Sequence, residues 1–241
     1  MTRARPVVAI DGPGGAGKTT VTQQVAARLG YSLVDTGALY RAVALAVQRR
    51  AVAWHDAPRI GEIARALADG RLLRFESGGA GGDSRVLLEG EDVSSAIRDP
   101  EIGRGASIVS ALPPVREALL AMQRDAGRQG GVVLEGRDIG TTVFPDAEAK
   151  FYLTASVDVR ARRRASELSS RGLPADLDDV RREVIERDAR DSSRPVAPLS
   201  RASDAELVDS SALEIDEVVE QIVRRVREVE ARLAEHARRT P

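Results

Sequence analysis

The amino-acid sequence predicts an α/β fold in which helices cover a parallel sheet. Short apolar runs alternate along the chain with amphipathic stretches of helical spacing, a pattern typical of parallel strands joined by helical crossovers. A glycine-rich segment, GPGGAGKT, follows directly on the first apolar run. The 241 residues are enough for one sizeable α/β core, or for a core with an inserted subdomain.

The apolar runs that are candidates for strands comprise residues 6–11, 31–36, 131–136, 150–155 and 205–211. After the first run, Val21, Val25 and Leu29 recur at helical spacing, and Gly30 is expected to end that helix as its cap. The last helix is expected from residue 215 to about residue 236, with valine and isoleucine on one face and charged residues on the other.

Two regions depart from this alternation. Residues 71–93 contain two short apolar runs around a glycine-rich loop, which predicts a hairpin within an insert of about residues 59–98. Residues 160–194 are crowded with arginine, and we expect most of these arginines to lie on a solvated helical face.

The composition excludes several classes of protein. A formal net charge of -1 gives no electrostatic reason to expect nucleic acid or an anionic membrane as a partner. No apolar run approaches the roughly 18 residues of a membrane span, and without cysteine there are no disulfides, thiolate nucleophiles or zinc–thiolate sites. The first residues, MTRARPVVAID, lack the apolar run of an export signal, so we expect a cytoplasmic location.

The segment GPGGAGKT, residues 12–19, fits the pattern G-x-x-x-x-G-K-[ST] of a phosphate-binding loop, or P-loop. Glycines let successive backbone N–H groups turn toward phosphate oxygens, and the following helix adds the partial positive charge of its N-terminus. Lys18 is one of two lysines in a chain whose other basic residues are arginine, which indicates that a compact ammonium is needed here. Thr19 offers a hydroxyl to Mg²⁺.

Three classes of P-loop protein are candidates. A GTPase needs the guanine-reading motif N-K-x-D, which a chain without asparagine does not contain. A motor or assembly ATPase needs a longer chain or partner-facing elements, and nothing in the sequence requires them. A small-molecule kinase needs a second anion site that faces the loop and a mobile lid that carries arginines. The sequence supplies both features, which favours a kinase.

The second anion site is predicted where strands end. Thr36 and Arg41, in the segment DTGALYR, follow the second strand at the start of a helix, where both can meet an anion. Arg137 and Asp138, in EGRDIGT, follow the third strand, and ligands of open parallel sheets bind beyond the carboxyl ends of the strands. The alternatives are an exposed helix residue for Arg41 and a local ion pair in a loop for the other two.

A further group of candidates lies in the segment ERDARDSSRPVAPL. Arg187, Asp191 and Arg194 are spaced by four and three residues, so we expect them to share one helical face. We also expect Arg194 to reach solvent and to contribute little to stability. The alternative is a salt-bridged surface helix with no role in binding.

Six segments together resemble the bacterial cytidylate kinase family: DGPGGAGKTT, LVDTGALYRAVAL, LLEGEDVSSAIR, ASIVSALPPVREALL, EGRDIGTTVFPDA and ERDARDSSRPVAPL. The resemblance runs from about Val7 to about Val226, nearly the whole chain. It implies a P-loop NTPase-type parallel five-stranded sheet with helices on both faces, an inserted NMP-binding subdomain with a small sheet, and an arginine-rich lid. Residues 1–241 would form a single kinase domain, with the insert at about residues 37–105 and the lid at about residues 158–194.

The resemblance also implies the reaction, ATP + CMP or dCMP ⇌ ADP + CDP or dCDP with Mg²⁺, and we expect a monomer. It assigns the ATP phosphates to Gly12, Pro13, Gly14, Gly15, Ala16, Gly17, Lys18, Thr19 and Thr20. It assigns the CMP phosphate to Thr36, Arg41, Arg137 and Arg194, cytosine to Ser107, Arg116 and Asp138, and the ribose to Arg187 and Asp191. Lid arginines within residues 160–164 would reach ATP on closure. Catalysis would fall to Lys18, Arg41, Arg137 and Arg194.

The choice of base is expected to depend on Asp138. A carboxylate accepts from the amino group of cytosine and repels the carbonyl that replaces it in uracil. Glu135, within or at the end of its strand, is the weaker candidate for this role. A different acceptor, such as UMP or a small alcohol, and a regulatory protein that hydrolyses ATP slowly are the alternative functions.

Overall fold

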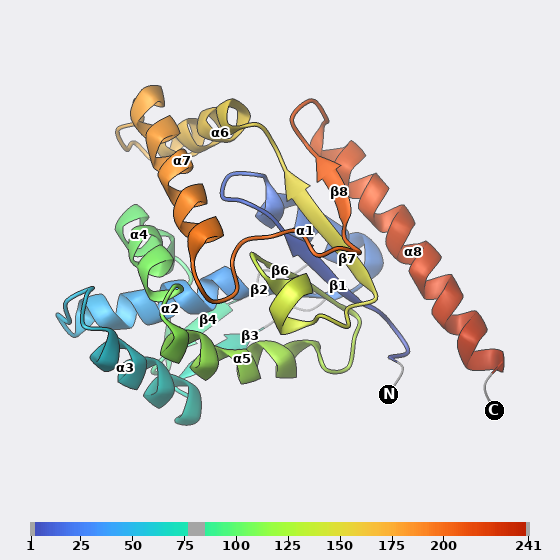
Figure 1. Cartoon of the computed structure of the whole chain (residues 1–241), viewed down its shortest axis with the longest axis horizontal. Helices are drawn as coiled ribbons and strands as arrows, with labels where there is room; N and C mark the ends of the chain where they lie inside the picture. The colour runs from blue at the N-terminus through green and yellow to red at the C-terminus, as the bar shows by residue number, and fades with distance from the viewer. Residues whose placement is uncertain (1–2, 77–84, 240–241) are drawn as a thin grey trace.

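The structure is a computed structural model that describes residues 3–76 and 85–239 (Figure 1). Its centre is a five-stranded sheet of β1 (Val7–Asp11), β2 (Ser32–Asp35), β6 (Val132–Gly136), β7 (Ala149–Thr154) and β8 (Glu206–Asp209), in the order β2-β6-β1-β7-β8. Every pairing in this sheet is parallel, so the carboxyl ends of the strands meet at one edge. The predicted α/β fold and its five strands are confirmed.

Both faces of the sheet are covered by helices, as predicted. Because side chains alternate along a strand, Val8 and Ile10 of β1 face one layer, and Val7 and Ala9 face the other. The first layer holds α1 (Lys18–Leu29) and α8 (Ile215–Arg239), whose valines and isoleucines are buried against the sheet. The second layer includes α5 (Pro113–Gly127) and the short π-helical turn η2 (Ile139–Val143), which follows β6.

The expected end of α1 is also confirmed. Gly30 caps the helix in the left-handed conformation, with φ of 63°, and its N–H donates to carbonyl groups of the last turn. α8 begins at the predicted residue and continues to Arg239, three residues beyond the expected end.

Next to the sheet lies a second packing unit, coloured light blue to green in Figure 1. It contains α2 (Thr36–Arg49), α3 (Ala57–Asp69), η1 (Ala96–Arg98), α4 (Pro100–Val109) and α5, with a small antiparallel sheet of β3 (Leu73–Glu76), β4 (Arg85–Leu88) and β5 (Glu91–Asp92). Its apolar side chains form one buried cluster that runs from Ala38 to Leu119. The strands of the predicted hairpin are present, while its loop, residues 77–84, lies outside the described residues.

The arginine-rich region forms a pair of helices, α6 (Val157–Ser170) and α7 (Leu177–Ser193). The pair has a small apolar cluster of its own, built from Ala161, Leu168 and Val180. It lies above α4 in Figure 1, and Arg104 of α4 forms an ion pair of 3.7 Å with Glu183 of α7. Within residues 3–76 and 85–239, no helix has both the length and the apolar character needed to cross a bilayer.

Candidate functional site

A cavity of about 680 Å³ lies beyond the carboxyl ends of the central strands, between the P-loop, the second packing unit and the α6–α7 pair. It is lined by most of the predicted site residues: Gly14, Gly15, Ala16, Gly17, Lys18, Thr19, Thr20, Thr36, Arg41, Ser107, Arg116, Arg137, Asp138, Arg187, Asp191 and Arg194. Gly12 and Pro13 are not among the lining residues, and their backbone oxygens accept from Nζ of Lys18. The structure therefore brings residues from five separate segments of the chain to one cavity.

The P-loop connects β1 to α1, and Gly12 and Gly17 are among its positions that require glycine. A Cβ atom at residue 12 would lie 1.9 Å from the backbone oxygen of Leu153 on the neighbouring strand β7, so only glycine fits. Gly17 has φ of 89° at the start of α1, a left-handed conformation that other residues resist. These two positions allow the loop to fold closely over the strand end and to present α1 to the cavity.

Lys18 extends along the inside of this loop. Its Nζ atom donates to the backbone oxygens of Gly12 and Pro13, both at 2.8 Å. Burial, together with the positive charge of Arg137, lowers the pKa of Lys18 well below its ordinary value. An anion bound in the loop would raise the pKa of Lys18, because a negative charge favours the protonated amine. The charged lysine and a phosphate group therefore stabilise each other.

The oxygen atoms near the start of α1 form a set that fits Mg²⁺. The Thr19 hydroxyl donates to Oε1 of Glu135 at 3.0 Å, and the Thr22 hydroxyl donates to Oε2 at 3.3 Å. Burial, and next the charge of Asp35, raises the pKa of Glu135 to about 7. Within the described residues, no three His, Cys, Asp or Glu side chains are grouped so that they could hold a metal ion by themselves. Mg²⁺ bound together with a phosphate needs fewer protein ligands, because one or two carboxylates and the phosphate oxygens share the ion.

Arg41 and Thr36 are positioned by the junction between β2 and α2. Asp35 caps α2 by accepting from the N–H of Ala38 at 3.0 Å, and its other oxygen accepts from Arg41 at 2.5 Å. The Thr36 hydroxyl donates to the backbone oxygen of Glu135 at 2.7 Å. Asp35 was not predicted as a site residue, although its place between a strand and a Thr-Gly pair is a signal for a helix cap.

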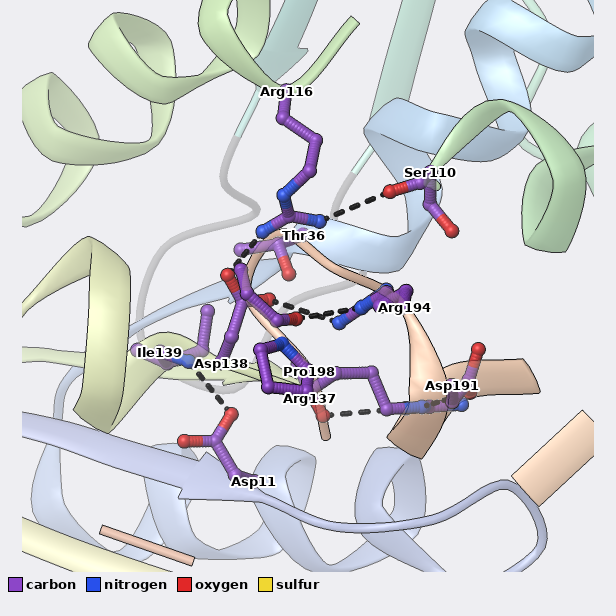
Figure 2. Close-up of polar contacts among 12 residues, drawn as sticks. Asp11, Thr36, Ser110, Arg116, Arg137, Asp138, Ile139, Asp191, Arg194 and Pro198 are labelled. Atoms are coloured by element: carbon purple, nitrogen blue, oxygen red, sulfur yellow. Dashed lines mark hydrogen bonds and ion pairs between the residues drawn. The ribbon is translucent and has the colours of Figure 1, made fainter. Parts of the chain in front are cut away.

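Asp138 lies between two arginines from different segments (Figure 2). Its Oδ2 atom accepts from Arg116 of α5, and its Oδ1 atom lies 3.6 Å from Nη2 of Arg194. Burial raises the pKa of Asp138, and the two guanidinium groups oppose this effect. Arg116 is itself held in place because it donates to the backbone oxygen of Ser110 at 3.2 Å.

Two expectations for Arg194 were wrong. The residue is 7% exposed, so it does not reach solvent. It also lies one position beyond the end of α7, in an extended conformation with ψ of 139°, and not on a helical face with Arg187 and Asp191. The reason is local, because Pro195 follows and a residue before proline is kept out of the helical conformation. The chain turns there, and Nε of Arg194 donates to the backbone oxygen of Ala197 at 2.6 Å.

The α6–α7 pair contacts the site through several charged groups. Asp191 accepts from Nε of Arg137 at 3.0 Å. Although burial alone would raise the pKa of Asp191, Arg137 and Arg187 hold it below its ordinary value. Burial, and next the charge of Arg137, lowers the pKa of Arg187 to about 10. The interpretation of α7 as a mere surface helix therefore does not describe these residues.

The arginines of residues 160–164 differ in their positions. Arg163 and Arg164 line the cavity, whereas Arg162 is exposed. Arg160 is buried and donates to the backbone oxygen of Gly14 at 3.2 Å, while its Nη2 atom lies 2.6 Å from Asp188 of α7. Arg160 therefore joins the P-loop to the α6–α7 pair.

The charge of the cavity is strongly positive. Among the described residues that line it, nine are basic and five are acidic: Lys18, Arg41, Arg98, Arg116, Arg137, Arg163, Arg164, Arg187 and Arg194, against Asp35, Glu135, Asp138, Glu167 and Asp191. Such an excess at closely spaced side chains is suited to ligands that carry several phosphate groups.

Comparisons with known proteins agree with this geometry. A family model of cytidylate kinases matches residues 8–228. The chain is 51% identical over 222 residues to a cytidylate kinase of Geobacter sp. (strain M21), an alignment that covers 92% of this chain and 93% of the relative. It is 48% identical over 218 residues to a cytidylate kinase of Chromobacterium violaceum, with 90% and 94% of the two chains covered.

A third relative is larger. A bifunctional pantoate ligase/cytidylate kinase of Synechococcus sp. (strain RCC307) is 52% identical over 224 residues, which cover 92% of this chain and 43% of the relative. The family model spans the chain from the P-loop strand into α8, and the relatives from Geobacter and Chromobacterium violaceum each align with at least 90% of both chains. This chain therefore belongs to the cytidylate kinase family.

Proposed function

We propose that this chain transfers the γ-phosphoryl group of ATP to CMP, and also to dCMP, giving ADP and CDP or dCDP. The observation that carries the proposal is the meeting of two sets of cations in one cavity. Lys18 of the P-loop faces it from one side, and Arg41, Arg137 and Arg194 face it from the acceptor side. Membership of the cytidylate kinase family supports the choice of substrates.

ATP would bind with its phosphates in the P-loop, residues 12–20. Thr19 and Glu135 would hold Mg²⁺, which when bound neutralises charge on the phosphate oxygens. Arg163 and Arg164 line the cavity, and Arg163 donates to the backbone oxygen of Ala16 in the P-loop at 3.3 Å, so we assign these two lid arginines to ATP. Arg160, which is buried beneath the loop, would position Gly14 instead of contacting the nucleotide.

CMP would bind opposite, with its phosphate near Thr36, Arg41, Arg137 and Arg194, and its ribose near Arg187 and Asp191. Ser107, Arg116 and Asp138 would bind cytosine. The buried hydroxyl of Ser107 supports this assignment, since it bonds to no other group in the described part of the chain. Burial of such a group without a partner is costly, and a base edge would satisfy it.

The γ-phosphoryl group is transferred by an in-line displacement. An oxygen of the CMP phosphate forms the new bond to the γ-phosphorus, and the bond from that phosphorus to the bridging oxygen breaks, so ADP leaves with the electron pair. The attacking oxygen is already anionic at neutral pH, so no strong general base is needed. Lys18 and the acceptor arginines stabilise the charge that spreads over the transferred oxygens.

We further propose that two parts of the chain move, the insert of about residues 37–105 and the lid of about residues 158–194. Each contributes to an apolar cluster separate from that of the sheet, which supports motion as a unit. Closure would exclude water, which otherwise competes with CMP for the phosphoryl group. One chain supplies every group named here, which supports action as a monomer.

The test is a coupled assay of ADP release with CMP, dCMP, UMP, AMP, GMP and shikimate as acceptors. We expect release that depends on an acceptor and is fastest with CMP or dCMP. Equal release with and without acceptors would favour a regulatory ATPase, and faster release with UMP or shikimate would favour a different kinase.

A further inference from the structure

Asp11, the last residue of β1, makes contacts that the phosphoryl-transfer mechanism above does not use. Its side chain is buried, with 4% of the residue exposed. Oδ1 accepts from the N–H of Ile139 and Oδ2 accepts from the N–H of Gly140, both at 2.8 Å. Figure 2 shows the carboxylate of Asp11 pointing from its strand toward Ile139. One carboxylate thus binds the first two N–H groups of the turn η2.

A helical turn needs such an acceptor, because its first N–H groups have no preceding carbonyl group in the turn. The usual acceptor is the residue just before the turn, and aspartate is among the residues best suited to this role. Here Asp138 occupies that position, yet its side chain does not cap η2 within the described structure. Its carboxylate is directed instead toward Arg116 and Arg194.

We propose that Asp11 is a positioning residue for recognition of the nucleoside monophosphate, a role that rests on the proposed function. By capping η2 from a neighbouring strand, Asp11 leaves the carboxylate of Asp138 free to face the cavity. Without this cap, the unpaired N–H groups at the start of η2 attract the carboxylate of Asp138, the residue that precedes the turn. The base-binding carboxylate then turns away from Arg116.

Loss of the Asp11 side chain is expected to weaken the binding of CMP more than the binding of ATP. The backbone of Asp11 is paired on both sides, with Gly136 of β6 and Tyr152 of β7, so the start of the P-loop remains held without the side chain. In contrast, Arg137 and Asp138 lie between the end of β6 and η2. Without the Asp11 side chain, their segment loses the hydrogen bonds that hold its far end at η2. The carboxylate of Asp11 therefore supports the acceptor side, while the strand pairing of its backbone holds the start of the P-loop.

The experiment compares Asp11→Asn with Glu148→Gln. Glu148 is a matched control because its Oε2 atom accepts from the N–H of Val7 at 2.9 Å, at the opposite end of the same strand and away from the cavity. In Asp11→Asn the amide oxygen accepts one N–H, and the amide nitrogen faces the other. Steady-state kinetics with CMP, UMP and ATP are measured for both variants and the wild type.

We expect Asp11→Asn to raise KM for CMP about 10-fold and to lower the CMP/UMP ratio of kcat/KM by a similar factor, while KM for ATP changes less than about twofold. Glu148→Gln should leave all three quantities within about twofold of the wild type. If Asp11→Asn behaves like Glu148→Gln, or raises KM for both substrates equally, the proposal is wrong.

A double-mutant cycle tests the link to Asp138. If Asp11 acts by freeing the Asp138 carboxylate, Asp11→Asn should not lower the CMP/UMP ratio further in an Asp138→Asn background. Independent, multiplying effects of the two substitutions would contradict the proposal. A wild type that fails to phosphorylate CMP would overturn the proposed function as well, whereas an active wild type with an unaltered variant overturns the role of Asp11 alone.

If the Asp11→Asn variant does not fold, amide hydrogen exchange of the wild-type protein tests the role of Asp11 instead. Coupling between two sites is reciprocal, so CMP must stabilise the capped turn if the capped turn favours CMP. We expect saturation with CMP to slow exchange of the Ile139 and Gly140 amides about 10-fold, with no change at Val7. Unchanged exchange at Ile139 and Gly140 would refute the role of Asp11.

Discussion

Arg116 and Asp138 form an ion pair inside the cavity, with their side chains only 8% and 7% exposed. The other carboxylate oxygen of Asp138 faces Arg194. Burial would favour the protonated acid, and the two guanidinium groups favour the carboxylate. A carboxyl group held on two sides in this way keeps a fixed direction, which the proposed discrimination between two bases requires.

Replacing this acceptor should change the choice of base. In Asp138→Ala, the loss of one charged hydrogen bond costs about 1–3 kcal/mol, so kcat/KM for CMP should fall roughly 10- to 150-fold. UMP should lose little or gain, because its carbonyl no longer meets a carboxylate. The measurement is the CMP/UMP ratio of kcat/KM. An unchanged ratio would mean that another group binds the amino edge of cytosine.

Lys18 should be irreplaceable in the P-loop. We expect Lys18→Ala to lower kcat by at least about 100-fold, since a charge that faces the transition state in a dry site is worth several kcal/mol. Lys18→Arg should also be poor, because a planar guanidinium does not fit where Nζ reaches two backbone oxygens at 2.8 Å. Near-normal turnover in Lys18→Arg would contradict the assignment.

Arg194→Met should affect both binding and stability, because the side chain is buried against Asp138 and Ala197. We expect a higher KM for CMP, a lower kcat, and a loss of about 1–3 kcal/mol in the free energy of unfolding. Arg190→Met is the control on the exposed side of α7, where the guanidinium lies 3.9 Å from Glu186. That substitution should change stability by less than about 0.5 kcal/mol. Equal behaviour of the two variants would argue against the buried role.

Asp11 should make stability depend on pH in a characteristic direction. Burial, opposed by Lys18 and by the N–H groups of η2 but assisted by the charge of Asp138, raises the pKa of Asp11 to about 6. The folded state therefore binds this proton more tightly than the unfolded state, and the contribution of Asp11 to stability falls as pH rises from about 4 to about 6.

The measurement is the free energy of unfolding of the wild type minus that of Asp11→Asn, from denaturant titrations at several pH values. This difference should decrease by about 1–3 kcal/mol between pH 4 and pH 6.5 and then level off. A difference that is flat or rises over this range would show that the folded-state pKa of Asp11 is not raised.

Much of the architecture follows from the sequence alone. The five strands and α1 were predicted because periodicity and caps are local properties, set by residues within a few positions of one another. The P-loop was recognised because its glycines, Lys18 and Thr19 act through their spacing along the chain. Arg41 and Arg137 could be placed at the cavity because the carboxyl ends of parallel strands meet at one edge.

Other features depended on which segments meet in three dimensions. The burial of Arg194 results from the turn at Pro195 together with a partner, Asp138, that lies on another segment. The contact between Asp11 and Ile139 joins residues 128 positions apart. It exists because β1 pairs with β6 in a register that places Asp11 opposite Gly136, three residues before the turn that it caps. Sequence periodicity specifies which face of a strand is buried, but the pairing of strands distant in sequence is decided only when the whole core packs together.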